Sequence, residues 1–371
     1  MKPIRILHTS DFHMDSPFES LSEGKAAIRR AELRQLPQKI ARLAAAEQVN
    51  LVLLCGDLLD SDSAFKETGE ELINSLRMIS VPVFIAPGNH DYYHEKAVYA
   101  SENLPDNVYV FKKNSIDYFD FPEKGFRIYG AAFTDRYSPS LMEDFHADRV
   151  PGIVNIMCLH GELDAPETPY NPISRNQIRD SRLDYLALGH VHKASGLKNE
   201  GDTFYSYSGC PEGRGFDETG EKTVNIIDLA EGKCNLRTVS VAARKYEQLE
   251  VDISEKDPLF SIQLALPDDT IKDIFRITLK GETEKSVPVN EIYKQISDLF
   301  FELRIEDRTT LKRNIWETGG ENTLRGSFLS KMRERFDKAE NETDKEIIEM
   351  AVRWGIAAID NCEEIVVHED Q

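Results

Sequence analysis

Short runs of apolar residues recur along the first half of the chain and predict buried β-strands. The runs cover residues 4–7, 51–54, 81–85, 153–157 and 185–188. Each is rich in leucine and β-branched residues without polar alternation, which is typical of strands covered on both faces of a sheet. Helical patterns at about 23–48 and 66–79 separate the first three runs, so we expect an α/β layer with right-handed crossovers.

Alternating polar and apolar positions over about 107–131 and 203–241 predict antiparallel strands, which we expect to form a second sheet against the first. The pattern changes near Arg244. Residues 246–287 predict a strand, a short helix and a strand, and residues 288–303 predict a helix that starts near Pro288.

Two more helices are predicted near the end of the chain, at about 324–339 and 343–361. The second carries an apolar stripe at helical spacing, which we interpret as core rather than as a partner surface. We therefore predict a four-layer α/β fold, with a two-sheet β-sandwich flanked by helices, a small α/β domain and C-terminal helices. The expected domains cover residues 1–243, 244–315 and 316–371.

Composition narrows the class of protein. No apolar run approaches the ~20 residues that a membrane span requires, so we expect no membrane association. Met1–Arg5 leads directly into a predicted strand, so we expect no secretory segment. The five cysteines are widely scattered, which favours reduced thiols and a cytoplasmic protein over a disulfide framework.

The formal net charge of −20 repels free anionic polymers and gives no support to nucleic-acid binding. If the chain binds an anion, it must therefore do so through a local cluster of basic residues. Arg29, Arg30 and Arg34 lie in one predicted helix, and we interpret them as a solvated helix face. Arg214 lies in a glycine-rich loop and is a candidate contact for a substrate backbone.

Metal-ligating side chains follow five of the apolar runs. The motifs are Ser10-Asp11-Phe12-His13, Gly56-Asp57, Gly88-Asn89-His90-Asp91, Cys158-Leu159-His160-Gly161 and Gly189-His190-Val191-His192. Any one of them alone is an ordinary strand-end turn. Five in order, each at the carboxyl end of a strand, are expected to meet at one edge of the sheet.

Carboxylate, amide and imidazole ligands from separate strand ends suit a pair of divalent metals that attack phosphate esters. In extended backbone, residues two apart point the same way, so we expect Asp11 and His13 to reach one cation. The same reasoning places His190 and His192 on one side. Asp57 has two carboxylate oxygens and is the natural bridging ligand, and Asn89 and His160 complete the candidate set.

These motifs resemble the five signatures of the calcineurin-like metallophosphoesterase superfamily over about residues 1–240. Within it, residues 6–13 and Tyr207-Ser208-Gly209 resemble the SbcD-type DNA repair nucleases, the meiotic-recombination-eleven family. Residues 15–18, 212–214 and 218–222 look closer to a YhaO-like branch. The resemblance implies the metallophosphoesterase fold, with a nuclease domain at 1–243 and a capping domain at 244–315.

The resemblance also implies a role for each site residue. Asp11, His13 and His192 would hold one metal, Asn89, His160 and His190 the other, and Asp57 would bridge them. His90 would contact the scissile phosphate and protonate the leaving oxygen, oriented by Asp91. Two Mn²⁺ ions are the expected cofactors, and Mg²⁺, Fe²⁺ or Zn²⁺ are possible substitutes.

One position departs from the family pattern. Some members carry a second active-site histidine where this chain has Asp60. A carboxylate there is unsuited to stabilising an anionic phosphate, and Asp60 either faces the substrate or caps the segment that follows.

The leading interpretation is a manganese-dependent DNA exo/endonuclease of double-strand-break repair. Its implied partners are DNA, an SbcC-like coiled-coil ATPase and a second copy of the chain, paired through helices at about 66–79 and 93–103. A phosphodiesterase or phosphatase for small molecules, or a DNA-end-binding scaffold protein, are the alternatives.

Overall fold

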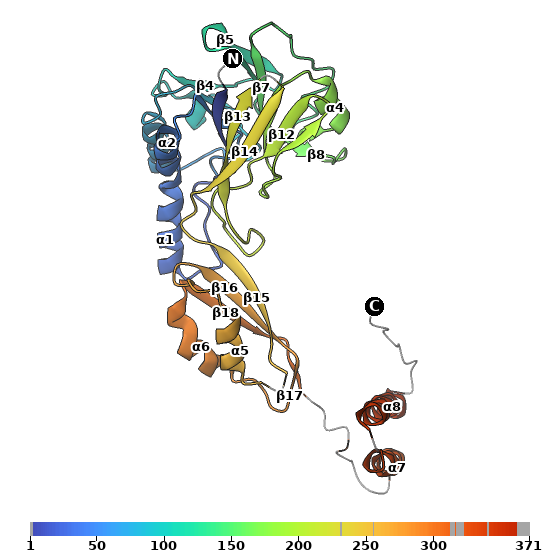
Figure 1. The fold of residues 1–371 in the computed structure, drawn as a ribbon. Coiled ribbons are helices and arrows are strands. Elements are labelled where there is room, and N and C mark those ends of the chain that lie inside the picture. The colour runs from blue at the N-terminus through green and yellow to red at the C-terminus, as the bar shows by residue number, and fades with distance from the viewer. Residues whose placement is uncertain are drawn as a thin grey trace. The chain divides into compact units, whose positions relative to one another are not determined.

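The computed structural model describes residues 3–230, 232–254, 256–311, 316, 323–339 and 341–361 (Figure 1). Its contacts divide the chain into two compact units. Unit 1 comprises Met1–Glu250, Ala265–Thr278 and Asn290–Glu306, and unit 2 comprises Val251–Leu264, Leu279–Val289 and Asp307–Gln371. The three sequence-based domains, 1–243, 244–315 and 316–371, stay a prediction.

The first sheet of unit 1 has the strand order β14-β13-β1-β2-β3-β4. Its strands are β1 (Ile4–Thr9), β2 (Leu51–Leu54), β3 (Val83–Ile85), β4 (Val108–Val110), β13 (Thr223–Ala230) and β14 (Lys233–Ser240). Strands β1 to β4 run parallel to one another, whereas β13 is antiparallel to both β1 and β14. The carboxyl ends of β1, β2 and β3 therefore share one edge.

The second sheet has the order β11-β12-β10-β7-β6-β5. Its strands are β5 (Asp117–Phe121), β6 (Phe126–Gly130), β7 (Val154–His160), β10 (Tyr185–Gly189), β11 (Lys198–Glu200) and β12 (Thr203–Tyr207). Strand β10 pairs in parallel with both β7 and β12. A short two-stranded sheet, β8 (Glu162–Leu163) with β9 (Pro172–Ile173), follows β7.

Successive side chains of the central strands are buried on opposite faces. On β2, Leu51 and Leu53 pack between the two sheets, whereas Val52 and Leu54 pack toward the helices. This explains why the central runs lack polar alternation. The helices on the first sheet are α1 (Glu23–Arg34), α2 (Leu36–Ala46) and α3 (Lys66–Leu76), and α4 (Arg175–Asp180) packs on the second through Ile178. The predicted two-sheet α/β fold flanked by helices is confirmed.

The long helix predicted at 23–48 is two helices that meet at Gln35. Pro37 lies in the first turn of α2, where its missing N–H costs nothing, but inside one continuous helix it would clash with the preceding turn.

The helix predicted at 93–103 is wrong. Those residues form turns and one 3-10 helix, Val98–Ala100, because the Tyr93 N–H donates to Phe133 and the buried Tyr99 hydroxyl donates to Asp91. Tertiary contacts outweigh helical propensity in this segment. A second 3-10 helix, Pro122–Lys124, joins β5 to β6.

Beyond β14 the chain forms a three-stranded sheet in the order β15-β16-β18. The predicted strand, short helix and strand are confirmed as β15 (Tyr246–Asp252), α5 (Pro258–Ala265) and β16 (Ile274–Lys280). The helix predicted at 288–303 is shorter, since α6 (Val289–Ile296) passes through a 3-10 turn (Ser297–Leu299) into β18 (Glu302–Asp307). Strands β17 (Glu282–Thr283) and β19 (Thr310–Leu311) pair in parallel.

The two predicted C-terminal helices are confirmed as α7 (Leu324–Asp337) and α8 (Glu342–Asn361), which pack on each other. No helix among the described residues is long and apolar enough to cross a membrane. The described cysteines, Cys55, Cys158, Cys210 and Cys234, are all free thiols, as predicted.

Arg29 corrects one sequence-based interpretation. We expected it on a solvated helix face, but its side chain is fully buried. Its guanidinium donates to Glu212 at 2.7 Å, to the Gly213 carbonyl at 2.8 Å and to Glu32 at 2.6 Å. The acceptors come mainly from a loop about 180 residues further along the chain, so no local pattern reveals them.

Candidate metal centre

The ligand-bearing loops of the two sheets meet at the carboxyl ends of their parallel strands. The loop after β1 is joined to the loop after β2, since the Asp11 N–H donates to the Gly56 carbonyl at 2.9 Å. The loop after β10 joins them, since the His190 N–H donates to the Asp11 carboxylate at 3.1 Å. A side chain at Gly189 would collide with the Cys55 carbonyl, so only glycine allows the strand ends this close.

The backbone at four of the candidate ligands is left-handed rather than extended. The φ angles are 57° at Asp11, 47° at His13, 52° at Asp57 and 100° at His190. The extended geometry from which we expected Asp11 to align with His13, and His190 with His192, is therefore wrong. Left-handed φ angles are uncommon outside glycine, although Asp and His adopt them more readily than most residues. Several of them close together indicate that surrounding contacts impose them, which happens most often at functional sites.

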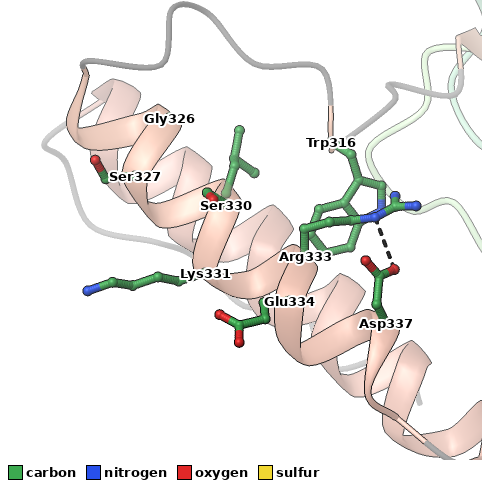
Figure 2. A pocket seen from close by; sticks show the side chains of 9 residues that line it. Trp316, Gly326, Ser327, Ser330, Lys331, Arg333, Glu334 and Asp337 are labelled. Atoms are coloured by element: carbon green, nitrogen blue, oxygen red, sulfur yellow. Dashed lines mark ion pairs between the residues drawn. The ribbon is translucent and has the colours of Figure 1, made fainter.

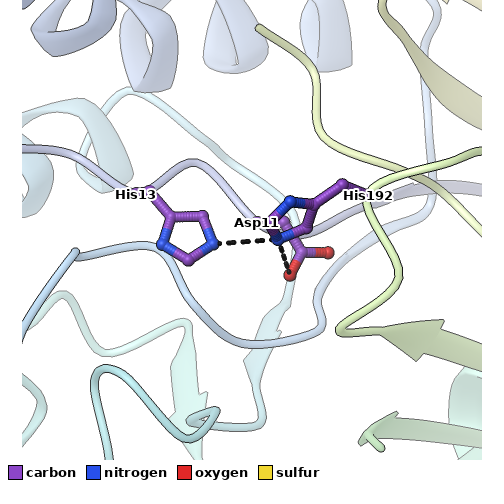
Figure 3. Close-up of side chains that lie close together, drawn as sticks. All are labelled: Asp11, His13 and His192. Carbon is purple, nitrogen blue, oxygen red and sulfur yellow. Dashed lines mark hydrogen bonds and ion pairs between the residues drawn. The ribbon is translucent and has the colours of Figure 1, made fainter. Parts of the chain in front are cut away.

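The first group of ligands comprises Asp11, His13 and His192 (Figure 3). The His13 Nε2 atom lies 3.2 Å from the His192 Nε2 atom, which in turn lies 3.7 Å from the Asp11 carboxylate. Asp11 and His13 are buried, whereas 31% of the His192 side chain is exposed. All three point at one common position.

The second group comprises Asn89, His160 and His190. The Asn89 Oδ1 atom lies 3.0 Å from His160 Nε2 and 3.2 Å from His190 Nδ1, and these two nitrogens are 3.2 Å apart. Burial and the neighbouring His160 lower the pKa of His190 to about 3, so its ring is neutral and has a free lone pair at neutral pH.

Asp57 lies between the two groups. Its Oδ2 atom is 3.4 Å from His160 Nε2 and 3.7 Å from His13 Nε2. Burial raises the pKa of Asp57, but His160 and His13 outweigh it and hold the pKa well below its usual range. Burial lowers the pKa of His160, yet Asp57 raises it to about 9. The buried carboxylate thus strongly favours positive charge between the two groups.

This donor set fits a pair of divalent cations. The Nδ1 atoms of His13 and His192 each face a carboxylate, Asp60 at 2.9 Å and Glu218 at 2.7 Å. Carboxylates accept hydrogen bonds, so each Nδ1 carries the proton and the two Nε2 lone pairs face each other at 3.2 Å. Nitrogens bound to one metal ion at about 2.1 Å lie roughly 3.0–3.4 Å apart, which matches this spacing.

Residues 4–194, about half the chain, match the family model described as calcineurin-like phosphoesterase. The chain belongs to the calcineurin-like phosphoesterase family. Membership implies a metal-dependent hydrolase of phosphate esters, and the candidate dinuclear ligands lie where that chemistry requires them.

Curated relatives of this phosphoesterase match most of its length at low identity. The "Uncharacterized metallophosphoesterase YhaO" of Bacillus subtilis is 26% identical over 336 residues, which cover 84% of this chain and 80% of the relative. The "DNA double-strand break repair protein Mre11" of Saccharolobus solfataricus is 24% identical and covers 83% of each chain. The SbcD component of the B. subtilis nuclease SbcCD is 21% identical over 62% of this chain and 67% of the relative.

His90 lies beside both ligand groups of the phosphoesterase. Its ring packs edge-on against the His13 ring at 4.8 Å, and its Nδ1 atom is 3.2 Å from the Asp60 carbonyl, to which it donates. A ligand atom of His90 also groups with His13 and Asp57. The predicted catalytic histidine is therefore next to the centre, with Nε2 free for a substrate or an ion.

Asp91 makes different contacts from those we expected. Its buried carboxylate accepts hydrogen bonds from the backbone N–H groups of Asp57, Leu58, Leu59 and Gly88 and from the Tyr99 hydroxyl. It makes no hydrogen bond with the His90 ring, which is oriented by the Asp60 carbonyl instead. Asp91 holds the loop after β2 against the loop after β3, and so positions Asp57 and Asn89.

Asp60 makes a contact that neither expectation included. It neither caps the next helix nor faces the site alone, since its carboxylate accepts from His13 Nδ1. Arg214 lies 3.6 Å from this carboxylate and forms a 2.7 Å ion pair with Glu218. The substrate-binding role predicted for Asp60 and Arg214 remains a prediction, while their observed contacts support the ligands of the first group.

Glu218 is the site residue that sequence reasoning missed. It accepts from His192 Nδ1 at 2.7 Å and is nearly buried. Burial raises its pKa, but His192 and Arg214 outweigh this and hold the pKa well below its usual range. Its position four residues after Arg214, in a loop that we had already singled out, was the available signal.

We expect Glu218→Gln to weaken metal binding about 10- to 100-fold, because the ionised partner of a ligating imidazole fixes its tautomer and raises its basicity. Titration of the metal-free chain with Mn²⁺, followed calorimetrically, measures the change. Glu162→Gln is the matched control, because the Glu162 carboxylate is 3.8 Å from His190 Nε2, beyond hydrogen-bonding distance. Equal affinities in the wild type and Glu218→Gln would contradict this role for Glu218.

Proposed function

We propose that the chain is a manganese-dependent DNA exo/endonuclease that processes DNA ends in double-strand-break repair. The observation that carries this proposal is the match along 83% of both chains to a DNA double-strand break repair protein, together with a full set of candidate ligands. An SbcD-type nuclease component also matches, at lower coverage.

The residues suggest how phosphodiester hydrolysis would proceed. Asp11, His13 and His192 would hold one Mn²⁺, and Asn89, His160 and His190 the other, with Asp57 shared. The bound ions would activate a water and neutralise charge on the phosphate oxygens. His90, fixed through Nδ1 by the Asp60 carbonyl, would place Nε2 at the leaving oxygen and protonate it.

The proposed partners are DNA, a second copy of the chain and an SbcC-like coiled-coil ATPase that binds the C-terminal helices. Exposed apolar side chains on α8 support a partner surface there: Ile347, Met350 and Trp354. From the sequence we interpreted the apolar stripe of this helix as core. Val352 of the stripe is buried, but the three exposed residues are not part of a core. Figure 2 shows a pocket along α7 where Arg333 pairs with Asp337 at 3.2 Å and lies 5.2 Å from the Trp316 ring.

Degradation of DNA by the purified chain tests the proposal. We expect linear single- or double-stranded DNA to be degraded with Mn²⁺ and to stay intact with EDTA, with bis(p-nitrophenyl) phosphate as the small-diester comparison. The net charge of −20 favours the competing assignment to a small phosphate ester. Intact DNA alongside rapid cleavage of the small diester would establish that assignment, and DNA binding without any hydrolysis would indicate a scaffold.

A further inference from the structure

A pocket of about 480 Å³ borders the candidate metal centre on the side of His192. We name it the Lys222 pocket. Its lining residues are His190, Val191, His192, Lys193, Asp217, Glu218, Thr219 and Lys222. It shares His190 and His192 with the two ligand groups, so a ligand in this pocket would lie next to the centre.

Lys222 is buried without an anionic partner. Its residue is only 8% exposed. Among the described residues, no carboxylate or other acceptor forms an ion pair or hydrogen bond with its ammonium group, and its one hydrogen bond is from the Ser240 hydroxyl to its backbone carbonyl. The stem of the side chain is held by the surrounding residues, while its charged end is open to the pocket, so the ammonium group is well placed to receive an anion.

The acidic residues of the pocket do not neutralise Lys222. The Glu218 carboxylate already pairs with Arg214 and with His192, each at 2.7 Å. Asp217 and Lys193, whose charges are opposite, are both exposed to solvent. Of the two lysines that line the pocket, Lys222 is therefore the one whose side chain is held in place by burial, whereas Lys193 is exposed.

The Lys222 charge is also close to the backbone of the ligand His192. The Cys210 thiol donates to the His192 carbonyl at 3.4 Å. The Lys222 Cε atom and the Glu218 carbonyl both lie beside Gly213, and the Glu218 carboxylate accepts a hydrogen bond from His192. Lys222 is thus near the segment that carries His192, although it makes no contact that would fix a metal ligand.

We propose that the Lys222 pocket binds a second phosphate group of the substrate, adjacent to the phosphodiester that is cleaved. This inference rests on the proposed function, since the neighbouring phosphates are those of a nucleic-acid strand. The second phosphate is either terminal or belongs to the next internal linkage. The pocket would select polynucleotides over single diesters and would set the strand's direction across the centre.

Calorimetric binding of short ligands to the full chain, with Mn²⁺ and again with EDTA, tests this pocket. The probes are a hydrolysis-resistant phosphorothioate thymidine dinucleotide and the same molecule with a 5′- or a 3′-terminal phosphate. We expect a terminal phosphate at one end to strengthen binding about 10-fold in the wild type, because an unpaired ammonium on a largely buried stem gains one charged hydrogen-bond partner. The preferred end reveals the direction of the strand.

Lys222→Gln should abolish that 10-fold gain, and Lys222→Arg should retain most of it. Lys198→Gln is the control, because Lys198 is exposed on β11 and outside the pocket. Circular dichroism establishes that each variant is folded. The inference is overturned if the wild type gains nothing from either terminal phosphate, or if Lys222→Gln keeps the gain. If DNA is not hydrolysed but Lys222→Gln still loses the gain, the proposed nuclease function fails and the phosphate pocket stands.

Discussion

Replacing His90 with asparagine is expected to lower the rate of phosphodiester hydrolysis by about 10²- to 10⁴-fold, the usual contribution of a positioned general acid. Asparagine cannot protonate a leaving oxygen. The loss should fall on kcat, because metal and substrate binding depend mainly on other residues. Steady-state hydrolysis of a thymidine dinucleotide, whose alkoxide leaving group must be protonated, gives kcat, and calorimetric titration with Mn²⁺ gives the metal stoichiometry.

His94→Asn is the matched control for this experiment. The His94 ring also contacts a backbone carbonyl, that of Asp62 at 3.3 Å, but it is not among the candidate ligands. We expect its kcat and metal stoichiometry to equal those of the wild type. Unchanged turnover in His90→Asn would refute the acid role, and a lost metal ion would show that His90 is a ligand, as its proximity to His13 and Asp57 permits.

Replacing Arg29 with methionine is expected to lower the free energy of unfolding by about 3–5 kcal/mol, because it leaves the buried Glu212 carboxylate without its cation. The substitution keeps much of the side-chain volume and removes the hydrogen bonds to Glu212, Gly213 and Glu32. Glu212 still accepts from the Ala243 N–H at 2.7 Å, which only partly compensates its charge. Urea denaturation, followed by circular dichroism, measures the change.

The adjacent Arg30 supplies the control. It pairs with Glu23, which is 87% exposed, so Arg30→Ala should change the free energy of unfolding by about 0–1 kcal/mol. Similar losses in both variants would mean that the buried pair is not the cause. A double variant, Arg29→Met with Glu212→Gln, should recover part of the loss, because it removes the uncompensated charge.

The order of the motifs made the candidate centre predictable from sequence. Apolar runs such as 51–54 and 185–188 are typical of central strands, and parallel strands of one sheet bring their carboxyl ends to one edge. Asp57 and His190 follow strands of different sheets, β2 and β10, so their approach to each other also depended on how the two sheets pack. The backbone that aims them was not predictable, since left-handed φ angles at Asp11, His13 and His190 arise from contacts between loops.

The residues that hold the candidate ligands in place were likewise not predictable from the sequence. Asp91 follows His90 in the sequence, yet its carboxylate is bonded to the loop after β2. The Glu218 hydrogen bond to His192 and the Arg29 ion pair with Glu212 join segments that no helical or strand periodicity links. Local patterns report which face of an element is buried, but not which distant atom meets a buried charge.

The sequence by itself determined the two-sheet α/β fold, the two C-terminal helices and the set of candidate metal ligands, because all three depend on periodicity and on residue type at strand ends. Only the tertiary structure decided that Asp60 and Glu218 hold the imidazoles of His13 and His192, that Arg29 is buried, and that Lys222 faces a pocket without a counterion. Those roles depend on distances between atoms far apart in the chain, which are set when the sheets and loops pack together.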